Sequence, residues 1–465
     1  MGACFDASAA PRRDRVHLPG CWSSRRLDGP HGRQPGYHHG LPCAGAEQCA
    51  RPAAAVCAAR GAVLPNRVSS GASSPVNRPS VVVQRCESYD DSARAVRAVV
   101  RALGWDTLRN ARVLIKPNMM KAAPPRDADA THPAFVGALT AALVEQGCEV
   151  LVGDSSGLLG FTREVFEVSG MTDAVRRAGG TVVSFDAGPF ERVQVGGRVG
   201  GVVWVPRALL AADHVILAPK LKTHTLTGMS CSVKNLMGLL PGATKCALHL
   251  RLPTPSSLSH GLLDIHHALE AAGVRFSGAV VDAVWVQAGR GSRAGAALRE
   301  LGLVLGSRDL LAADLACASL IGGDASRLST IAAARQRALG PSSLDDVDLT
   351  GDMTSLNVPP IEPAVSGIKD RSSVAHLAHY WLRERVVEPW HDASRCCGVR
   401  ACVAVCPTRC IEVRGGRPAI GPGCVRCFAC HEACPHDAMR LRVPRAARGL
   451  FASRAKGLDV SKVFE

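Results

Sequence analysis

Closely spaced cysteines near the end of the chain are the residues whose spacing points most directly to chemistry. Cys424, Cys427, Cys430 and Cys434 follow the pattern C-x2-C-x2-C-x3-C-P. Three thiolates at this spacing fold around one iron–sulfur cluster, and the fourth reaches a second cluster. A zinc ribbon needs two C-x2-C pairs separated by a longer loop, so zinc fits the pattern poorly. The spacing therefore predicts iron–sulfur ligands.

An earlier half-motif lacks one ligand. Cys396, Cys402 and Cys406 stand at the expected spacing, but Val399 occupies the second position, where a cysteine is expected. Valine has no donor atom, so two main alternatives remain open. Either the neighbouring Cys397 supplies the fourth thiolate, or the site holds a [3Fe–4S] cluster or a cubane with one iron open to an exogenous ligand. An empty second site is a third alternative.

The two half-motifs predict two sites that exchange their last cysteines. In a two-cluster module, the cysteine before the proline ligates the other cluster. The expected cofactors are therefore one intact [4Fe–4S] cluster and a second cluster with an incomplete ligand set. The predicted metal ligands are Cys406, Cys424, Cys427 and Cys430 for the intact cluster, and Cys396, Cys397, Cys402 and Cys434 for the other.

A second set of chemically competent residues lies in the middle of the chain, where short apolar runs end. Lysine and histidine at such positions, beside glycine-rich backbone and helix N-termini, can bind a carboxylate or a phosphate. Each polar cluster alone is typical of a turn, but four of them together predict a pocket for an anionic small molecule. The predicted ligand-binding residues are Lys116, Asn118, Asp154, Ser155, Lys220, Lys222, Lys234, Asn235 and Lys245.

Acid–base chemistry in this pocket is assigned to two histidines and an aspartate. His224 or His249 is the expected proton donor, because imidazole titrates near neutral pH. Asp154 or Asp282 is expected to orient it. The alternatives are that His249 is a surface residue and that Asp282 caps a helix. The sequence contains no P-loop and no G-x-G-x-x-G after the first clear strand, so no nucleotide-binding motif is predicted.

The elements that position these residues follow an alternating pattern. Continuous apolar strands separated by amphipathic helices predict an α/β fold, a parallel sheet covered by helices on both faces. Ligands of such sheets bind at the carboxyl ends of the strands. Strands are expected at 113–115, 150–152, 181–185, 202–205, 214–217, 279–281 and 303–305. Helices are expected at 133–146, 162–178, 259–272 and 309–320.

The domain organisation follows from composition. Residues 1–78 show no apolar periodicity and are predicted to be disordered. An α/β domain over 79–355 is followed by a linker with a helix (356–394). A small α+β iron–sulfur domain (395–442) with a hairpin over 411–420 follows, and then a basic tail (443–465). Cys410 within the small domain is interpreted as a core residue.

Composition and charge exclude several classes of protein. The 465 residues are 47% apolar, with a mean hydropathy of +0.09. Residues 202–218 form the best apolar stretch but contain Pro206, Arg207 and Asp213, so no membrane span is predicted. The net charge of +15 lies in the termini, since residues 81–364 hold 28 basic and 27 acidic residues. With 4% aromatic residues, nucleic-acid binding is not predicted. Many thiols without a secretory signal predict a cytoplasmic protein.

The polar clusters and the cysteine module together resemble a known combination. The cysteine module resembles a two-cluster ferredoxin-type domain, and the α/β part resembles domain-of-unknown-function family number 362, which is often fused to such a module. The resemblance implies this architecture rather than an activity. The chain departs from the family pattern after the Asp282 strand, where it has Gly289-Arg-Gly-Ser-Arg. The motifs that carry the family resemblance are Ile115-Lys116-Pro117-Asn118, Thr131-His132-Pro133, Gly153-Asp154-Ser155, Pro219-Lys220-Leu221-Lys222-Thr223-His224, Lys234-Asn235-Leu236-Met237-Gly238, Lys245 with His249, Val281-Asp282 and Ala313-Asp314.

Three functions are compatible with these features. The first is an iron–sulfur oxidoreductase that exchanges electrons between its clusters and an anionic substrate in the Lys/His pocket. The second is a non-enzymatic electron carrier or iron–sulfur scaffold that docks on a protein partner. The third is a redox-independent ligase or isomerase. The basic residues around the cysteine module favour an acidic electron donor or acceptor protein.

Overall fold

The computed structural model describes residues 78–156, 162–224, 227–242, 244–288, 297–321, 325, 328–352, 388–424 and 426–442. The chain divides into two units, residues 1–72 and 73–465, and all described residues belong to the second unit. The predicted disordered segment (apart from Arg78), the predicted helix in the linker and the basic tail lie outside the described residues. No helix in the described part of the chain is long and apolar enough to cross a bilayer.

A ten-stranded sheet forms the centre of the described α/β part. Its strands are β1 (Ser80–Arg85), β2 (Arg112–Pro117), β3 (Glu149–Asp154), β4 (Thr181–Ser184), β7 (His214–Ala218), β8 (Lys220–His224), β9 (Gly228–Ser230), β10 (Phe276–Ala288), β11 (Ala297–Ser307) and β12 (Asp348–Gly351). Eight of them follow the order β12-β1-β11-β10-β7-β2-β3-β4, and β8 pairs with β10 and β9. The strands from β10 to β4 are parallel to their neighbours.

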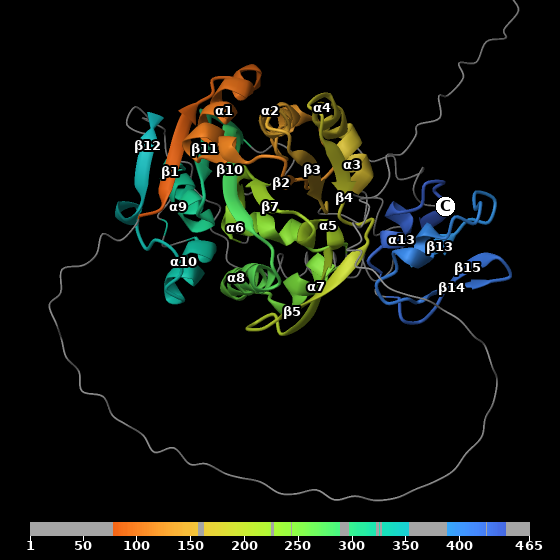
Figure 1. Ribbon diagram of the computed structural model, residues 1–465. Coiled ribbons are helices and arrows are strands. Elements are labelled where there is room, and N and C mark those ends of the chain that lie inside the picture. The colour runs from red at the N-terminus through yellow and green to blue at the C-terminus, as the bar shows by residue number, and fades with distance from the viewer. Residues whose placement is uncertain are drawn as a thin grey trace, which may run out of the picture. The chain divides into compact units, whose positions relative to one another are not determined.

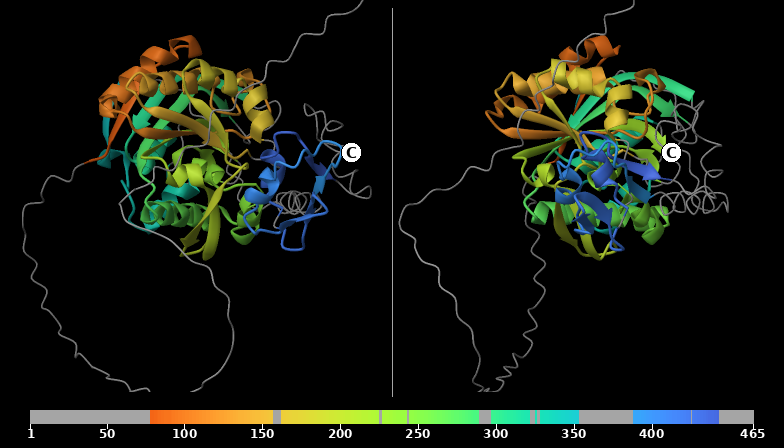
Figure 2. Two further views of the ribbon diagram at one scale, coloured as in Figure 1. Left: turned by 45° about the vertical axis from the view of Figure 1, so that its right-hand side comes forward. Right: turned by 90° about the vertical axis from the view of Figure 1, so that its right-hand side faces the viewer.

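Helices cover both faces of this sheet, as the sequence predicts (Figure 1, Figure 2). The principal helices are α1 (Ser92–Ala102), α2 (Pro133–Val144), α3 (Thr162–Val168), α4 (Met171–Arg177), α8 (Pro255–Ala271), α9 (Leu310–Leu320) and α10 (Ser329–Gln336). Helices α1, α2 and α4 lie on one face and α9 on the other (Figure 1). The core between α1, α2 and the sheet contains Val96, Phe135, Val152 and Ile216, all fully buried. Burial of such apolar surface is the main driving force for the fold.

The sheet is mixed rather than wholly parallel, which corrects the prediction. β11 runs antiparallel to both β1 and β10. The predicted strand at 202–205 is present as β6 (Gly201–Pro206), but it pairs with β5 (Phe190–Val195) outside the central sheet. The predicted helix at 162–178 is divided into α3 and α4 because Gly170 adopts a left-handed φ of 74°, which terminates a helix.

The lysine-rich run after β7 is a strand, whereas the sequence indicated a polar loop. β8 pairs in parallel with β10, with Lys220 opposite Asp282 and Lys222 opposite Gln287. Both lysines are buried. The two charged residues interrupt the apolar run that would predict a strand from the sequence. The carboxylates that neutralise them are distant in the chain and are identified only in the folded structure.

The cysteine module consists of two short sheets and two helical turns. β13 (Glu388–His391) pairs with β16 (Met439–Arg442), and β14 (Ile411–Arg414) pairs with β15 (Arg417–Ile420) as the predicted hairpin. The turns are α12 (Ala401–Ala404) and α13 (Ala429–Glu432). Its small core contains Cys402, Ile411, Cys430, Cys434, Ala438 and Met439.

Candidate functional site

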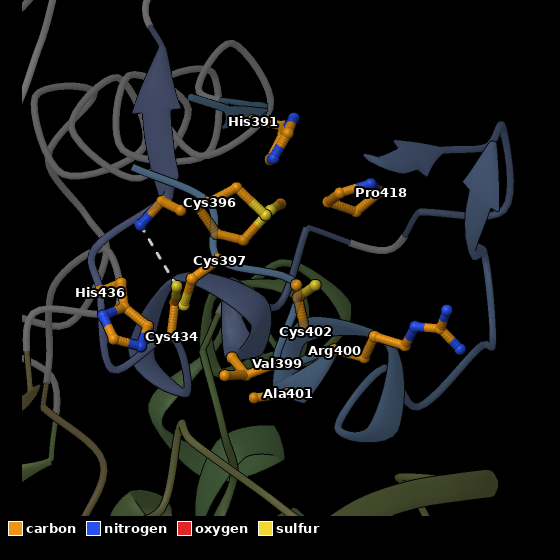
Figure 3. A pocket seen from close by; sticks show the side chains of 13 residues that line it. His391, Cys396, Cys397, Val399, Arg400, Ala401, Cys402, Pro418, Cys434 and His436 are labelled. Atoms are coloured by element: carbon orange, nitrogen blue, oxygen red, sulfur yellow. Dashed lines mark hydrogen bonds between the residues drawn. The ribbon is translucent and has the colours of Figure 1, made fainter. Parts of the chain in front are cut away.

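Two cavities in the cysteine module are lined by cysteines in the predicted groups. We call them the Cys427 cavity and the Val399 cavity. The Cys427 cavity contains every predicted ligand of the intact cluster, and the Val399 cavity (Figure 3) contains those of the other. The cysteines lining them are Cys406, Cys410, Cys424, Cys427 and Cys430 in the first, and Cys396, Cys397, Cys402 and Cys434 in the second.

These donors suit a cluster better than a single ion. Within the described ranges, no three His, Cys, Asp or Glu side chains converge closely enough to hold one metal ion. Around a cluster, each thiolate binds a different iron, so the sulfurs line a cavity instead of meeting at one point. Four or more cysteine sulfurs line each cavity, and such thiols are the donors that iron–sulfur clusters use.

Burial raises the pKa of the Cys427 and Cys430 thiols, which makes both difficult to ionise without a cation. Burial and, to a lesser extent, the neighbouring thiols of Cys406 and Cys424 together raise the pKa of Cys427 to about 12. Positively charged metal reverses this effect and stabilises the thiolate. Cys410 also lines the cavity, with its Sγ 3.5 Å from Cys406 Sγ. Cys410 also packs against the small core of the module, in agreement with its interpretation as a core residue.

The Val399 cavity is bordered by exposed residues of the module. Val399 is 54% exposed and Cys397 is exposed, whereas Cys402 and Cys434 are buried. The backbone N–H of Ala438 donates a hydrogen bond of 3.2 Å to Cys434 Sγ, drawn as a dashed line in Figure 3. Such a bond orients the sulfur and stabilises its negative charge.

In the α/β domain, Lys116 and Asp154 form a buried ion pair at the ends of β2 and β3. Lys116 Nζ lies 2.8 Å from Asp154 Oδ1 and donates to Asn235 Oδ1 at 2.8 Å. The Met119 N–H donates to Asp154 Oδ2 at 2.7 Å. Gly238 packs so closely that a Cβ there would overlap the carboxylate and the ammonium group. The pair therefore holds strand ends and loop in one arrangement.

Lys220 and Asp282 form a second buried pair, also 2.8 Å apart. Lys220 donates to the Tyr89 hydroxyl at 2.7 Å, and Tyr89 donates to Asp282 at 3.1 Å. The Tyr89 ring stacks on His132 at 3.5 Å, and the His132 N–H donates to Asp282 at 3.0 Å. Among the described residues, Asp282 contacts neither of the two predicted proton donors, so its predicted role of orienting them is corrected to that of neutralising Lys220.

Lys222 has a third buried carboxylate as its partner. Its Nζ donates to the Asp129 carbonyl and lies 3.3 Å from Asp129 Oδ1. Lys121 lies 3.1 Å from the other carboxylate oxygen. Three of the predicted ligand-binding lysines are thus matched by aspartates, and their first role is to build the wall of the site.

Lys234 differs from these lysines. It forms no hydrogen bond or ion pair with any described residue and is only half-buried. Burial, together with the charges of Lys222, Lys116 and Lys245, lowers its pKa to about 7. The structure therefore places an unmatched amine among like charges, where an anion is attracted.

Two histidines share the electrostatic environment of Lys234. Burial lowers the pKa of His249 to about 3 and lowers that of His224 well below its usual value, and Lys234 contributes to both shifts. His249 Nδ1 is buried without a hydrogen-bond partner among the described residues. Both rings are neutral at pH 7. We call Lys234, His224, His249 and Lys245 the lysine–histidine site.

Lys245 connects this site to the cysteine module. Its Nζ donates to the carbonyl and the hydroxyl of Ser155, each at 2.6 Å. The Ser155 hydroxyl donates to Asp186 at 2.5 Å, and the Gly242 N–H donates to the same carboxylate at 2.6 Å. A Cβ at Gly242 would overlap the carbonyl oxygen of Cys427. The Cys427 cavity and the lysine–histidine site are therefore separated by one loop.

A second contact holds the module in place. Glu432 of α13 is buried; it accepts a hydrogen bond of 3.1 Å from Ser184 and lies 3.6 Å from Arg163. Burial, together with the charge of Asp186, raises its pKa to about 8. Pattern reasoning did not select Asp186 or Asp129. Asp186 follows the predicted strand at 181–185, so the same strand-end rule would have identified it.

Asn118, a predicted ligand-binding residue, makes a structural contact instead of joining the lysine–histidine site. Asn118 uses its N–H to bind the Thr131 hydroxyl at 2.8 Å, and its side-chain oxygen is buried without a partner among the described residues. Several segments that flank the site in the chain lie outside the described residues. They are 157–161, 225–226, 243 and 289–296, the last of which contains the Gly289 motif.

Fold and site together define a mixed α/β protein with a polar site at the ends of its parallel strands and an attached cysteine module. Residues 113–319 match the model of the family described as Domain of unknown function (DUF362). The chain is 27% identical over 271 residues to a thylakoid-associated protein of Synechocystis sp., covering 57% of this chain and 82% of that protein.

Solved structures with a likeness to the chain share little sequence with it. The lactate racemase apoprotein of Thermoanaerobacterium thermosaccharolyticum is 14% identical, with a TM-score of 0.34 over 52% of this chain and 56% of that one. A Thermotoga maritima protein is 14% identical, with a TM-score of 0.29 over 44% of this chain and 52% of that one. The chain thus spans about half the length of these structures.

Proposed function

We propose that the protein is an iron–sulfur oxidoreductase that exchanges electrons with an anionic small molecule bound at the lysine–histidine site. The observation that carries this proposal is the contact between Gly242 and Cys427. It places a predicted cluster ligand against the loop that leads to Lys245. Two sites that served unrelated purposes would not need this proximity.

The cysteine module would hold the cofactors. Cys406, Cys424, Cys427 and Cys430 would bind one cluster, and Cys396, Cys402 and Cys434 would contribute three thiolates to the other. When bound, such clusters supply one-electron redox chemistry. The protein contributes the buried thiols and the Ala438 hydrogen bond to Cys434, and it packs the Cys427 cavity against the α/β domain.

Lys234 would bind the anionic group of the substrate. Its charge has no partner among the described residues, whereas Lys116, Lys220 and Lys222 are matched by buried aspartates. A bound anion raises the pKa of nearby bases, because opposite charge favours their protonated forms. Substrate binding would thereby protonate Lys234 and bring His249 or His224 closer to the range in which it donates a proton.

A direct test begins with the cofactor. Protein purified anaerobically is analysed for iron and acid-labile sulfide and by low-temperature EPR spectroscopy. We expect the protein to contain clusters. Their redox state should change when a small anionic substrate is added to the wild type, but not when it is added to Lys234→Met. Iron-free protein, or clusters indifferent to every candidate substrate, would count against the proposal.

The second candidate is an electron carrier or iron–sulfur scaffold for a protein partner in the cytoplasm. The exposure of the Val399 cavity favours it, because an exposed cluster is accessible to a partner. Transfer of an intact cluster from the Val399 cavity to an apo-protein, with no dependence on Lys234, would support this candidate over the enzyme.

A further inference from the structure

At the Val399 cavity, Cys396, Cys402 and Cys434 stand at motif positions, a valine occupies the remaining motif position, and Cys397 is the predicted substitute ligand. We propose that His391 is the fourth ligand of this site, through its Nε2 atom. The inference rests on the proposed binding of iron–sulfur clusters. It identifies the residue that ligates the iron for which the motif supplies no cysteine. It replaces neither the three cysteines nor the ligands of the Cys427 cavity.

The first observation is the position of His391. It is the last residue of β13, paired with Met439 of β16, so its backbone is fixed by a sheet. It lines the same cavity as Cys396, Cys402 and Cys434. Figure 3 shows its imidazole beside Cys396 at one end of this cavity.

The second observation is an unsatisfied nitrogen. His391 Nε2 is shielded from solvent and has no hydrogen-bond partner among the described residues. A buried polar atom left unpaired is unfavourable, so native structures almost always provide it with a partner. An iron atom in the cavity is a partner that suits this nitrogen, because neutral imidazole is a common metal ligand.

The chemistry of iron–sulfur sites permits the exchange of thiolate for imidazole. In Rieske centres, histidines replace cysteines on one iron, and the reduction potential rises because a neutral ligand takes the place of an anionic one. The other candidates in this cavity are Cys397 and His436, both exposed. Solvent can hydrate their donor atoms, so neither needs a partner in the cavity.

The test uses the full chain, purified anaerobically and reconstituted with iron and sulfide. Pulsed EPR on the reduced protein measures hyperfine coupling to nitrogen, with and without ¹⁵N-labelled histidine. We expect the strong coupling of a directly bound imidazole in the wild type and in His436→Ala, which is the matched control. The coupling should be lost in His391→Ala and in His391→Cys. His391→Cys should keep its iron and show a lower reduction potential at this site.

The outcomes separate this inference from the proposed function. Iron in both cavities without a strongly coupled histidine nitrogen would overturn the assignment of His391 and leave the proposed function standing. Coupling that persists in His391→Cys would also overturn it. If Cys397→Ser, and not His391→Ala, removes iron from this site, then Cys397 is the ligand. Protein without iron at either site would refute both proposals.

Discussion

Three buried lysines in the α/β domain are each paired with the carboxylate of one aspartate. Lys116, Lys220 and Lys222 each lie within 3.3 Å of an aspartate oxygen. In a medium of low dielectric constant, an ion pair of this kind stabilises the fold only while both partners are present. Their burial and pairing explain why the lysine-rich motif is compatible with a strand.

Lys220→Met should therefore destabilise the protein strongly. It leaves the Asp282 carboxylate buried without a cation, and we expect a loss of about 3–5 kcal/mol in the free energy of unfolding. Arg97→Met is the control, because it breaks the exposed pair with Glu145, with an expected loss of about 0–1 kcal/mol. Urea unfolding followed by circular dichroism measures both. Equal losses would show that the buried pair contributes no more than the exposed one.

Lys234 should control anion binding through its own protonation. With a pKa lowered to about 7, the side chain is cationic below pH 7 and neutral above it. The affinity for sulfate, which does not titrate in this range, should fall about tenfold between pH 6 and pH 8, following the charged fraction of the lysine. Isothermal titration calorimetry measures the affinity.

Two variants make this prediction specific. Lys234→Met should bind sulfate weakly at both pH values. Arg101→Met, which removes a cation from the exposed end of α1, should retain the affinity and the pH dependence of the wild type. If Lys234→Met still shows the tenfold change in sulfate affinity, then another group, such as a histidine of the site, is responsible for the pH dependence.

At the scale of elements, the sequence is most informative where apolar runs are unbroken. β2, β3, β7, α2 and α9 lie close to their predicted ranges because their burial pattern is visible in the residues. β8 was missed because Lys220 and Lys222 break its apolar run, and the aspartates that neutralise them lie 62 and 93 residues away in the chain. The antiparallel direction of β11 was missed because strand direction depends on long-range pairing.

The candidate site was predictable to a similar extent. Cysteine spacing predicted both groups of thiols, because the ligands of each half-motif are adjacent in sequence. Strand-end reasoning selected Lys234 and Lys245 but did not distinguish them from the ion-paired lysines. That distinction depends on where each amine finds a carboxylate, which only the tertiary structure determines.

The loop at Gly242 should be the most sensitive connection between the two parts of the site. Gly242→Ala introduces a Cβ into the Cys427 carbonyl and also strains the backbone, since φ is 46°. Gly415→Ala is a matched control, because its φ of 56° imposes similar strain but no atom lies within 4 Å. We expect about 1–2 kcal/mol of destabilisation from strain in the control and a larger loss in Gly242→Ala.

Thermal unfolding and stopped-flow reduction measure the two consequences. Gly242→Ala should lower Tm more than Gly415→Ala does, and it should slow electron exchange with the substrate while iron content stays at the wild-type level. Equal Tm values would mean that the loop moves aside without resistance and that its close contact with Cys427 is dispensable.

On the scale of the whole molecule, the two cavities differ in what surrounds them. The Cys427 cavity is packed against the Gly242 loop of the α/β domain, whereas the Val399 cavity is bordered by exposed residues of the module, including Arg400 and His436. Under the proposed function, electrons would pass from a partner at the Val399 cavity through the Cys427 cavity to the substrate. Arg400, which borders the Val399 cavity, would favour an acidic partner.

Iron should therefore leave the two sites in a fixed order. The Val399 cavity is bordered by exposed residues and has a valine at the second position of the ligand motif, so mild oxidation with ferricyanide should remove iron there first and give the EPR signal of a three-iron centre. A thiolate holds iron more firmly than a neutral ligand, because it adds a negative charge to the bond, so Val399→Cys should suppress that signal. Val413→Cys, which places a thiol on the exposed hairpin strand β14, should behave like the wild type. Simultaneous loss of iron from both cavities in the wild type would show that packing against the α/β domain does not protect the Cys427 cavity.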